Sequence, residues 1–208
     1  ATKQLEGAWV IRYTMGMSVF YLPMFVAGHI YALLSDYPPD GFSEPYQTAM
    51  YIGCFLYVLL GLFMLRKVLV KLFNNTIATI VLVVIVLGTN YLHVATVTPA
   101  MPHATMFMVF CFILWFSIKW YETRKMKYIV LLGICIGLAT LSRPTEFIAI
   151  LIPILLGVTS VKGLVPHVLS FLKENRNQLF VLVLTVFICF LPQMLYWKKY
   201  AGSFIFDF

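Results

Sequence analysis

The sequence predicts an all-α protein, a polytopic bundle of transmembrane helices. Of the 208 residues, 62% are hydrophobic and only 11% are charged, and the mean hydropathy is +0.91. Soluble domains do not carry so large an apolar share. The apolar residues also gather in segments near the ~20 residues that a helix needs to cross a bilayer.

The apolar residues fall into segments that are each expected to form a helix, and short polar connectors separate them. Several segments are short for a span, and Pro153 interrupts one of them. No period of roughly 20–50 residues recurs, which argues against a repeat array. In chain order, the expected helices cover residues 13–34, 48–65, 76–94, 105–119, 127–142, 147–161 and 178–197.

The first segment admits two interpretations, because it begins beside Arg12 and contains Pro23 and His29. If it spans the membrane, the N-terminus is cytoplasmic; if it lies in the interface, the start of the chain is one long external loop. We therefore expect residues 1–47 to be an external or juxtamembrane region or a first membrane helix. Residues 48–208 are expected to form a core of about six spans, and the whole to be one membrane domain.

The net charge of +7 is concentrated in alternate connectors, which the positive-inside rule assigns to the cytoplasm. The other side then carries the prolines, acids and histidines of residues 35–47, 95–104 and 143–146, so we expect the function there. Lys198 and Lys199 run against the rule. Aromatic and basic residues do not interleave as in single-strand binders, so no nucleic-acid partner is expected. The basic connectors contain Arg66, Lys67, Lys71, Lys119, Arg124, Lys125, Lys127, Lys162, Lys173 and Arg176.

An arginine and a glutamate bracket a proline between two apolar segments, at Ser142-Arg143-Pro144-Thr145-Glu146. Ionisable residues at membrane depth are costly and usually face a wet cavity or a partner. Pro144 disfavours a helical Arg143, so the preceding helix should end there, and Ser142 or Thr145 should cap the next. The planar fork of Arg143 suits a phosphate. The alternative is an Arg143–Glu146 pair that only pins the turn.

Three acids, Asp36, Asp40 and Glu44, lie in the proline-rich segment 36–46. Carboxylates there suit a general base or oxygen ligands of a divalent metal ion; the alternative is an ordinary polar turn. The cofactor is otherwise unknown.

Two further polar residues lie next to prolines. His103 follows Pro102 just before an apolar segment and suits phosphate binding or acid–base work, although a structural role is at least as common. Gln193 follows Pro192 near the end of the last segment, where an interface anchor is the alternative. Soluble nucleotide and hydrolase motifs are absent from the sequence. The four cysteines match no metal motif and are expected to be small buried hydrophobes: Cys54, Cys111, Cys135 and Cys189.

Several short pieces together resemble bacterial members of the GT-C superfamily, polytopic glycosyltransferases of the protein-mannosyltransferase and aminoarabinose-transferase type. They are spread over nearly the whole chain, and their order and spacing carry the resemblance. The pieces are Tyr13-Thr14-Met15-Gly16, residues 40–46 with Tyr46 at the end, Gly88-Thr89-Asn90, Met101-Pro102-His103, residues 137–146 with their Arg-Pro-Thr core, and residues 192–202.

The resemblance implies an enzyme of a bacterial inner membrane that moves a sugar from a polyprenyl-phosphate donor to an acceptor at the non-cytoplasmic face. It implies contacts to the lipid-linked sugar from Arg143 and His103, and we add Glu146, Tyr46 and Gln193 as substrate-binding candidates. It also implies a catalytic aspartate in the first external loop. We expect that aspartate upstream, in a longer protein of which this chain is a core fragment, which leaves Asp40 and Glu44 as the catalytic candidates here. Membrane lipids, and protein partners in a larger complex, are the other expected partners.

Two other functions remain open. Short, proline-broken helices with an Arg–Glu pair also suit a transporter or flippase-like protein, although the sequence shows no inverted symmetry. A non-catalytic membrane subunit of a larger assembly is the second alternative. An upstream external loop bearing an aspartate would favour the enzyme over both.

Overall fold

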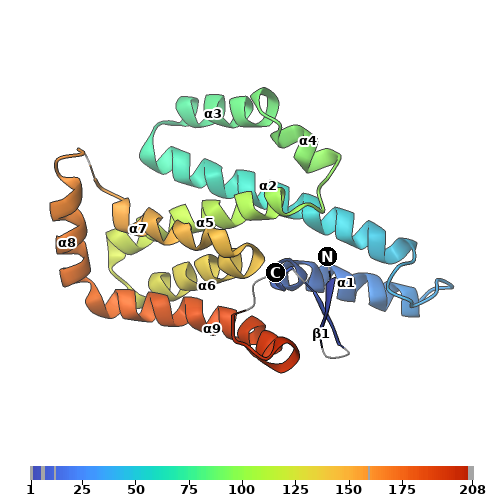
Figure 1. Ribbon diagram of the computed structural model, residues 1–208. Coiled ribbons are helices and arrows are strands. Elements are labelled where there is room, and N and C mark those ends of the chain that lie inside the picture. The colour runs from blue at the N-terminus through green and yellow to red at the C-terminus, as the bar shows by residue number, and fades with distance from the viewer. Residues whose placement is uncertain (1, 6–7, 12, 159, 206–208) are drawn as a thin grey trace. The chain divides into compact units, whose positions relative to one another are not determined.

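The computed structural model describes residues 2–5, 8–11, 13–158 and 160–205, with side chains from residue 13 onward (Figure 1). The chain divides into two compact units, one of residues 17–115 and the other of residues 1–16 with 116–208. Each unit is described by itself.

The unit of residues 17–115 is a set of helices around a small apolar core. Asn74 caps α3, because its Oδ1 accepts from the backbone N–H of Ile77 at 2.9 Å. The buried Tyr91 of α4 donates its hydroxyl to the backbone oxygen of Val58 on α2 at 3.3 Å, which ties α4 to α2. The helices are α1 (Gly16–Leu33), α2 (Glu44–Leu72), α3 (Asn75–Gly88), α4 (Tyr91–Thr96) and the first part of α5 (Pro102–Thr123).

The second unit is organised around the close pairing of α6 with α9. Gly133 and Gly137 lie on one face of α6, so that the backbone of α9 approaches closely: a Cβ on Gly137 would lie 2.6 Å from Cβ of Cys189. Besides the end of α5, the unit contains β1 (Thr2–Leu5), β2 (Ala8–Ile11), α6 (Met126–Ser142), the 3-10 helix η1 (Pro144–Ile150), α7 (Leu151–Leu155), α8 (Leu164–Glu174) and α9 (Arg176–Ala201).

Among the residues that the structure describes, four helices are long and apolar enough to cross a membrane, namely α1, α2, α5 and α9, which confirms the all-α membrane class. Their outward side chains are large and apolar, for example Phe55 on α2 and Ile188 on α9, each about half exposed. Lipid is the solvent that such surfaces match. The first segment forms one continuous helix, Gly16–Leu33, and whether it spans the membrane stays a prediction.

The structure departs from the predicted elements in five places. The third segment breaks at Thr89 and Asn90 into α3 and α4, and residues 144–155 form η1 followed by the short α7. The second helix begins at Glu44, so Glu44 and Tyr46 lie in its first turn rather than in a loop. Residues 164–174, expected as part of a connector, form α8, and a β-hairpin with Thr2 opposite Ile11 precedes α1.

Candidate functional site

Arg143 follows directly on the last residue of α6 and has an extended backbone, with φ −145° and ψ 112°. This confirms that Pro144 ends the helix, because a residue before proline avoids the helical region. The predicted cap is wrong: no side chain caps η1, and the hydroxyl of Ser142 instead donates to the backbone oxygen of Leu138 at 2.8 Å.

The side chains of Arg143 and Glu146 form a loose pair. Nη1 of Arg143 lies 4.0 Å from Oε1 of Glu146, and the two side chains are 47% and 20% exposed. A separation of 4.0 Å is too long for a hydrogen bond. A partly exposed ion pair of this length contributes little to stability, so the guanidinium keeps donor capacity for another anion.

The chain before α1 is tied to the ends of α6 and α9. The buried Gln193 of α9 accepts the backbone N–H of Met15 at 2.9 Å, and Thr14 donates its hydroxyl to the backbone oxygen of Ser142 at 3.2 Å. Gly16 fits here because a Cβ would lie 2.2 Å from the backbone nitrogen of Ser142. Gln193 therefore holds residues next to the arginine turn, and its Oε1 is occupied by that contact.

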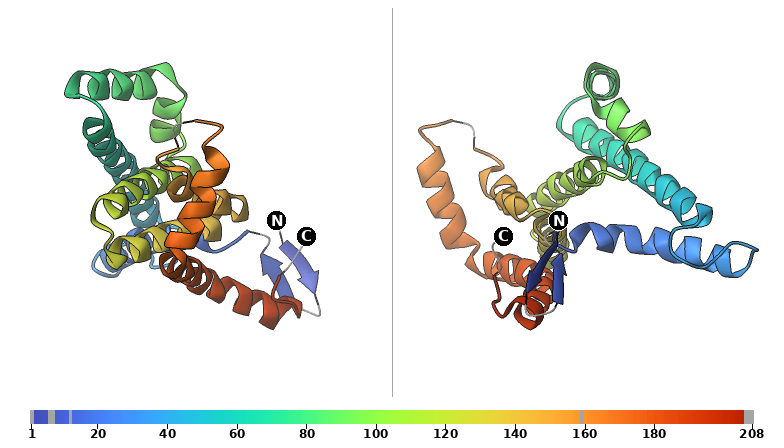
Figure 2. Two further views of the ribbon diagram at one scale, coloured as in Figure 1. Left: turned by 90° about the vertical axis from the view of Figure 1, so that its left-hand side faces the viewer. Right: turned by 45° about the vertical axis from the view of Figure 1, so that its right-hand side comes forward.

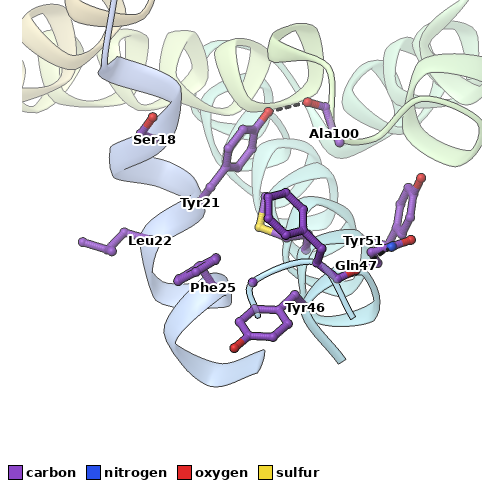
Figure 3. A pocket seen from close by; sticks show the side chains of 11 residues that line it. Ser18, Tyr21, Leu22, Phe25, Tyr46, Gln47, Tyr51 and Ala100 are labelled. Atoms are coloured by element: carbon purple, nitrogen blue, oxygen red, sulfur yellow. Dashed lines mark hydrogen bonds between the residues drawn. The ribbon is translucent and has the colours of Figure 1, made fainter. Parts of the chain in front are cut away.

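The unit of residues 17–115 contains a pocket of about 520 Å³ between the starts of α1 and α2 (Figure 3). Five of its eleven lining residues are aromatic, and the walls carry a few hydroxyl and amide groups, a composition typical of ligand sites. The lining residues are Ser18, Tyr21, Leu22, Phe25, Gly41, Phe42, Tyr46, Gln47, Met50, Tyr51 and Ala100.

Hydrogen bonds hold the aromatic side chains of this pocket. Tyr46, 2% exposed, shares a hydrogen bond of 2.5 Å between its hydroxyl and Nδ1 of His29, and its ring lies 5.1 Å from that of Phe25. Tyr21 donates its hydroxyl to the backbone oxygen of Ala100 (Figure 3). The pocket thus joins residues 41–46 to the segment that leads to His103.

Asp40 organises the turn that forms one rim of the pocket. Its Oδ1 accepts the backbone N–H groups of Phe42 and Ser43, each at 2.8 Å. These two hydrogen bonds favour the ionised form and lower the pKa of Asp40. The structure therefore gives Asp40 a turn-forming role, and its lowered pKa makes it a weaker proton acceptor.

Glu44, the first residue of α2, accepts a hydrogen bond from the hydroxyl of Tyr37 at 3.3 Å. The negative charge of Glu44 raises the pKa of Tyr37, so this tyrosine remains a donor. Both side chains are exposed, as are Asp36 and His103, the latter in the first turn of α5. Among the described residues, no group of three or more His, Cys, Asp or Glu side chains gathers to hold a metal ion.

The family model for dolichyl-phosphate-mannose-protein mannosyltransferases matches residues 42–197, which is most of the chain. The chain belongs to this family. No curated protein and no solved structure matches this chain. The mannosyltransferase family confirms the resemblance to the GT-C superfamily and identifies the chain as a membrane glycosyltransferase of that type.

The part of the chain that matches the mannosyltransferase family contains Glu44, Tyr46, His103, Arg143 and Gln193. It also contains Glu146. Asp40 lies outside the matched range, as does α1, which forms one wall of the aromatic pocket. The two groups of candidates fall in different units: Tyr46 and His103 in residues 17–115, and Arg143, Glu146 and Gln193 in the other.

Sequence reasoning missed the aromatic face of α1 and the glycines of α6. Tyr21, Phe25 and His29 recur every fourth residue and so share one face of the helix. Gly133 and Gly137 form a G-x-x-x-G pattern in an apolar segment, which is typical of close helix packing in membranes. Both signals are visible in the sequence once helical spacing is counted.

Proposed function

We propose that this chain moves a sugar from a polyprenyl-phosphate donor to an acceptor at the non-cytoplasmic face of a membrane, expected to be a bacterial inner membrane. The observation that carries the proposal is the position of Arg143. It lies in a turn that Pro144 fixes, at the end of an apolar helix, and it is half exposed with its carboxylate neighbour 4.0 Å away. A planar fork of this kind suits a lipid phosphate.

Arg143 would act on the leaving group. When the acceptor oxygen bonds to the anomeric carbon, the bond from that carbon to the phosphate oxygen breaks, and the phosphate keeps the electron pair. The guanidinium stabilises the charge that develops on the phosphate, which is the kind of interaction that accelerates the chemical step. His103, which lies in the other unit, stays a separate candidate for phosphate binding.

A carboxylate would take the proton from the acceptor hydroxyl in the same step. Of the two candidates in this chain, Glu44 suits the role better than Asp40. Asp40 has a lowered pKa, and its Oδ1 accepts two backbone N–H groups at 2.8 Å, whereas Glu44 accepts one longer hydrogen bond, 3.3 Å from the hydroxyl of Tyr37, through Oε2.

The aromatic pocket is proposed to accommodate the apolar part of a substrate. Phe25, Phe42 and Met50 supply apolar wall, and Tyr46 is held in place by His29. Such a wall suits an isoprenoid chain or the apolar face of a sugar. Protein partners in a larger complex remain part of the proposal as well.

Replacing Arg143 tests the proposal, because Arg143→Lys keeps the positive charge but loses the planar fork. We expect this change to weaken polyprenyl-phosphate binding, measured in detergent or nanodiscs, by about tenfold or more, in line with the loss of a charged hydrogen bond. Glu146→Gln should change binding much less. Thermal unfolding of both variants is the control for folding.

If Arg143 only forms an ion pair with Glu146, we expect the opposite pattern of binding and stability. In that case both single changes destabilise the protein, and the double change Arg143→Gln with Glu146→Gln restores the thermal midpoint. Unchanged phosphate binding by Arg143→Lys together with that rescue would overturn the proposal.

A further inference from the structure

The geometry points to α8 as a helix that lies in the lipid headgroup layer and binds anionic lipid. We infer this from three features of the unit that contains α6 to α9: the direction of α8, its two apolar faces, and the charges around it.

The direction of α8 differs from that of the helices it joins. It runs crosswise to α6 and α9 at one end of them (Figures 1 and 2). Since α9 is long and apolar enough to cross a membrane, its axis gives the approximate direction of the membrane normal. A helix crosswise to it at its end lies along the membrane surface.

One face of α8 is fixed to the protein. Phe171 is buried, with its ring 5.6 Å from that of Trp120 and 6.2 Å from that of Tyr121. His167 on the same face contacts the backbone oxygen of Ile154 through Nε2 at 3.1 Å. These contacts fix the rotation of the helix about its axis.

The neighbouring face of α8 is apolar and exposed. Val165, Leu169 and Leu172 recur at helical spacing and are 64%, 63% and 43% exposed. The opposite face is polar and carries Ser170 and Glu174, which hydrogen bond to each other at 2.8 Å. A helix with an apolar stripe beside a fixed face and a polar face opposite matches an interfacial helix.

The charges at this end of the unit are mostly positive. Arg124 donates to Oδ1 of Asn175 at 3.1 Å, which brings the connector between α5 and α6 to the junction of α8 with α9. The acids at this end are Glu122, paired with Lys119 at 3.3 Å, and Glu174. The basic side chains of the two connectors are Lys119, Arg124, Lys125, Lys127, Lys162, Lys173 and Arg176.

The exposed stripe of α8 therefore contacts the lipid bilayer, which α9 enters directly after Asn175, and does not pack into a groove of another protein. Acyl chains cover Val165, Leu169 and Leu172, and the surrounding basic side chains attract anionic headgroups.

A fluorescent label on the whole chain tests the placement. In a chain whose four cysteines are replaced, Leu169→Cys and the matched control Ser170→Cys are each labelled with a nitrobenzoxadiazole probe and placed in phosphatidylcholine nanodiscs. We expect doxyl-labelled lipid to quench the probe at 169 and iodide in the water to quench the probe at 170. Quenching of both probes by iodide alone would overturn the proposal. So would a probe at 169 that neither agent reaches, because a protein partner or a second copy then covers the stripe.

The anionic preference is tested with the same probe at 169. Doxyl-labelled phosphatidylglycerol should quench it more strongly than doxyl-labelled phosphatidylcholine at equal content. The pair Lys162→Gln and Lys173→Gln should reduce that preference by about fivefold or more. Each basic residue near an anionic surface strengthens the binding to anionic lipid by about fivefold. The control pair Lys198→Gln and Lys199→Gln, at the other end of α9, should leave it unchanged. Equal quenching by the two lipids would overturn the claim of anionic lipid binding.

Discussion

Close backbone contact decides the role of Gly16. The residue is buried at the start of α1, and a Cβ there would lie 2.2–2.4 Å from backbone atoms of Leu141 and Ser142. Backbone atoms cannot rotate away as a flexible side chain can, so even a methyl group requires a shift of α1 or α6. The hydrogen bond from Thr14 to Ser142 lies in the same contact.

Gly16→Ala is therefore expected to lower the free energy of unfolding by about 1–3 kcal/mol, the usual cost of overpacking. A thermal or denaturant unfolding transition in detergent measures it. Gly88→Ala is the matched control, because a Cβ there meets only Val84 Cγ1 at 3.5 Å. Equal stability of Gly16→Ala and the parent would contradict the close contact.

Asp40 gives the loop between α1 and α2 a dependence on pH. Its pKa is lower in the folded chain than its ordinary value of 3.8, because Phe42 and Ser43 donate to the carboxylate. The stabilisation of the turn is therefore present above the ordinary pKa and is lost as the pH falls through the lowered one.

We expect the amide proton resonances of Phe42 and Ser43 to shift together below pH 3.8, as the carboxylate that accepts them becomes protonated. Nuclear magnetic resonance of labelled protein in detergent measures the shift. Asp40→Asn should abolish it while keeping an oxygen acceptor at the same place. A transition at or above the ordinary value would contradict the hydrogen-bonded turn.

At the scale of elements, the contact of α6 with α9 depends on two small residues. Without a hydrophobic driving force between helices in lipid, close packing supplies much of the association. Gly133 faces Thr185, and Gly137 faces Cys189, with Cβ positions 2.6–2.7 Å from those side chains. The arginine turn follows directly on α6, so this contact also positions Arg143.

Gly137→Ala should consequently loosen the two helices and lower the thermal midpoint, with a cost of about 1–3 kcal/mol from overpacking. Leu131→Val on the outward side of α6, where Leu131 is 38% exposed, should be close to neutral. Polyprenyl-phosphate binding by Gly137→Ala should fall as well. A variant with the stability of the parent would show that α9 is not held at this contact.

The elements differ in how far the sequence predicted them, and the reason is local. Apolar length and Pro144 are visible in the sequence, so the end of α6 and five of the seven expected helices were predicted correctly; the five are those expected at residues 13–34, 48–65, 105–119, 127–142 and 178–197. The break after α3 was missed because it depends on Thr89, whose hydroxyl donates to Ile85 at 2.6 Å and accepts from the N–H of Tyr91 at 3.1 Å. Such side-chain to backbone bonds compete with the helix, and apolar content does not reveal them.

The candidate sites were predicted less completely than the helices. Arg143 was chosen as a candidate because a charge in an apolar sequence is conspicuous, and its role stays a prediction. The pocket was missed because its walls are ordinary aromatic residues of α1 and α2, and only the approach of the two helices makes them a site. The turn-forming contacts of Asp40 with Phe42 and Ser43 were not predicted, because residue type alone does not distinguish a base from a turn former; its catalytic role stays a prediction.

At the scale of the whole molecule, the expected orientation in the membrane rests on the charges at the ends of the helices. The hydrogen bond between Arg124 and Asn175 places the connectors around residues 119–127 and 162–177 at the same end of their unit. α6 runs 17 residues from there to Arg143, about 25 Å at 1.5 Å per residue, so Arg143 lies at the opposite end of α6 from the basic connectors. The basic end is expected to be cytoplasmic.

Cysteine labelling in intact cells measures this orientation. In a chain without its own cysteines, Lys125→Cys and Lys162→Cys should both be protected from a membrane-impermeant maleimide until the cells are opened. Thr145→Cys, in the exposed turn beside Arg143, should react from outside, which is the side where the lipid-linked sugar is proposed to bind. Labelling of Lys125→Cys from outside with protection of Thr145→Cys would reverse the orientation and move the proposed transfer to the cytoplasmic face. Different accessibility of Lys125→Cys and Lys162→Cys would instead contradict the shared end that the contact of Arg124 with Asn175 defines.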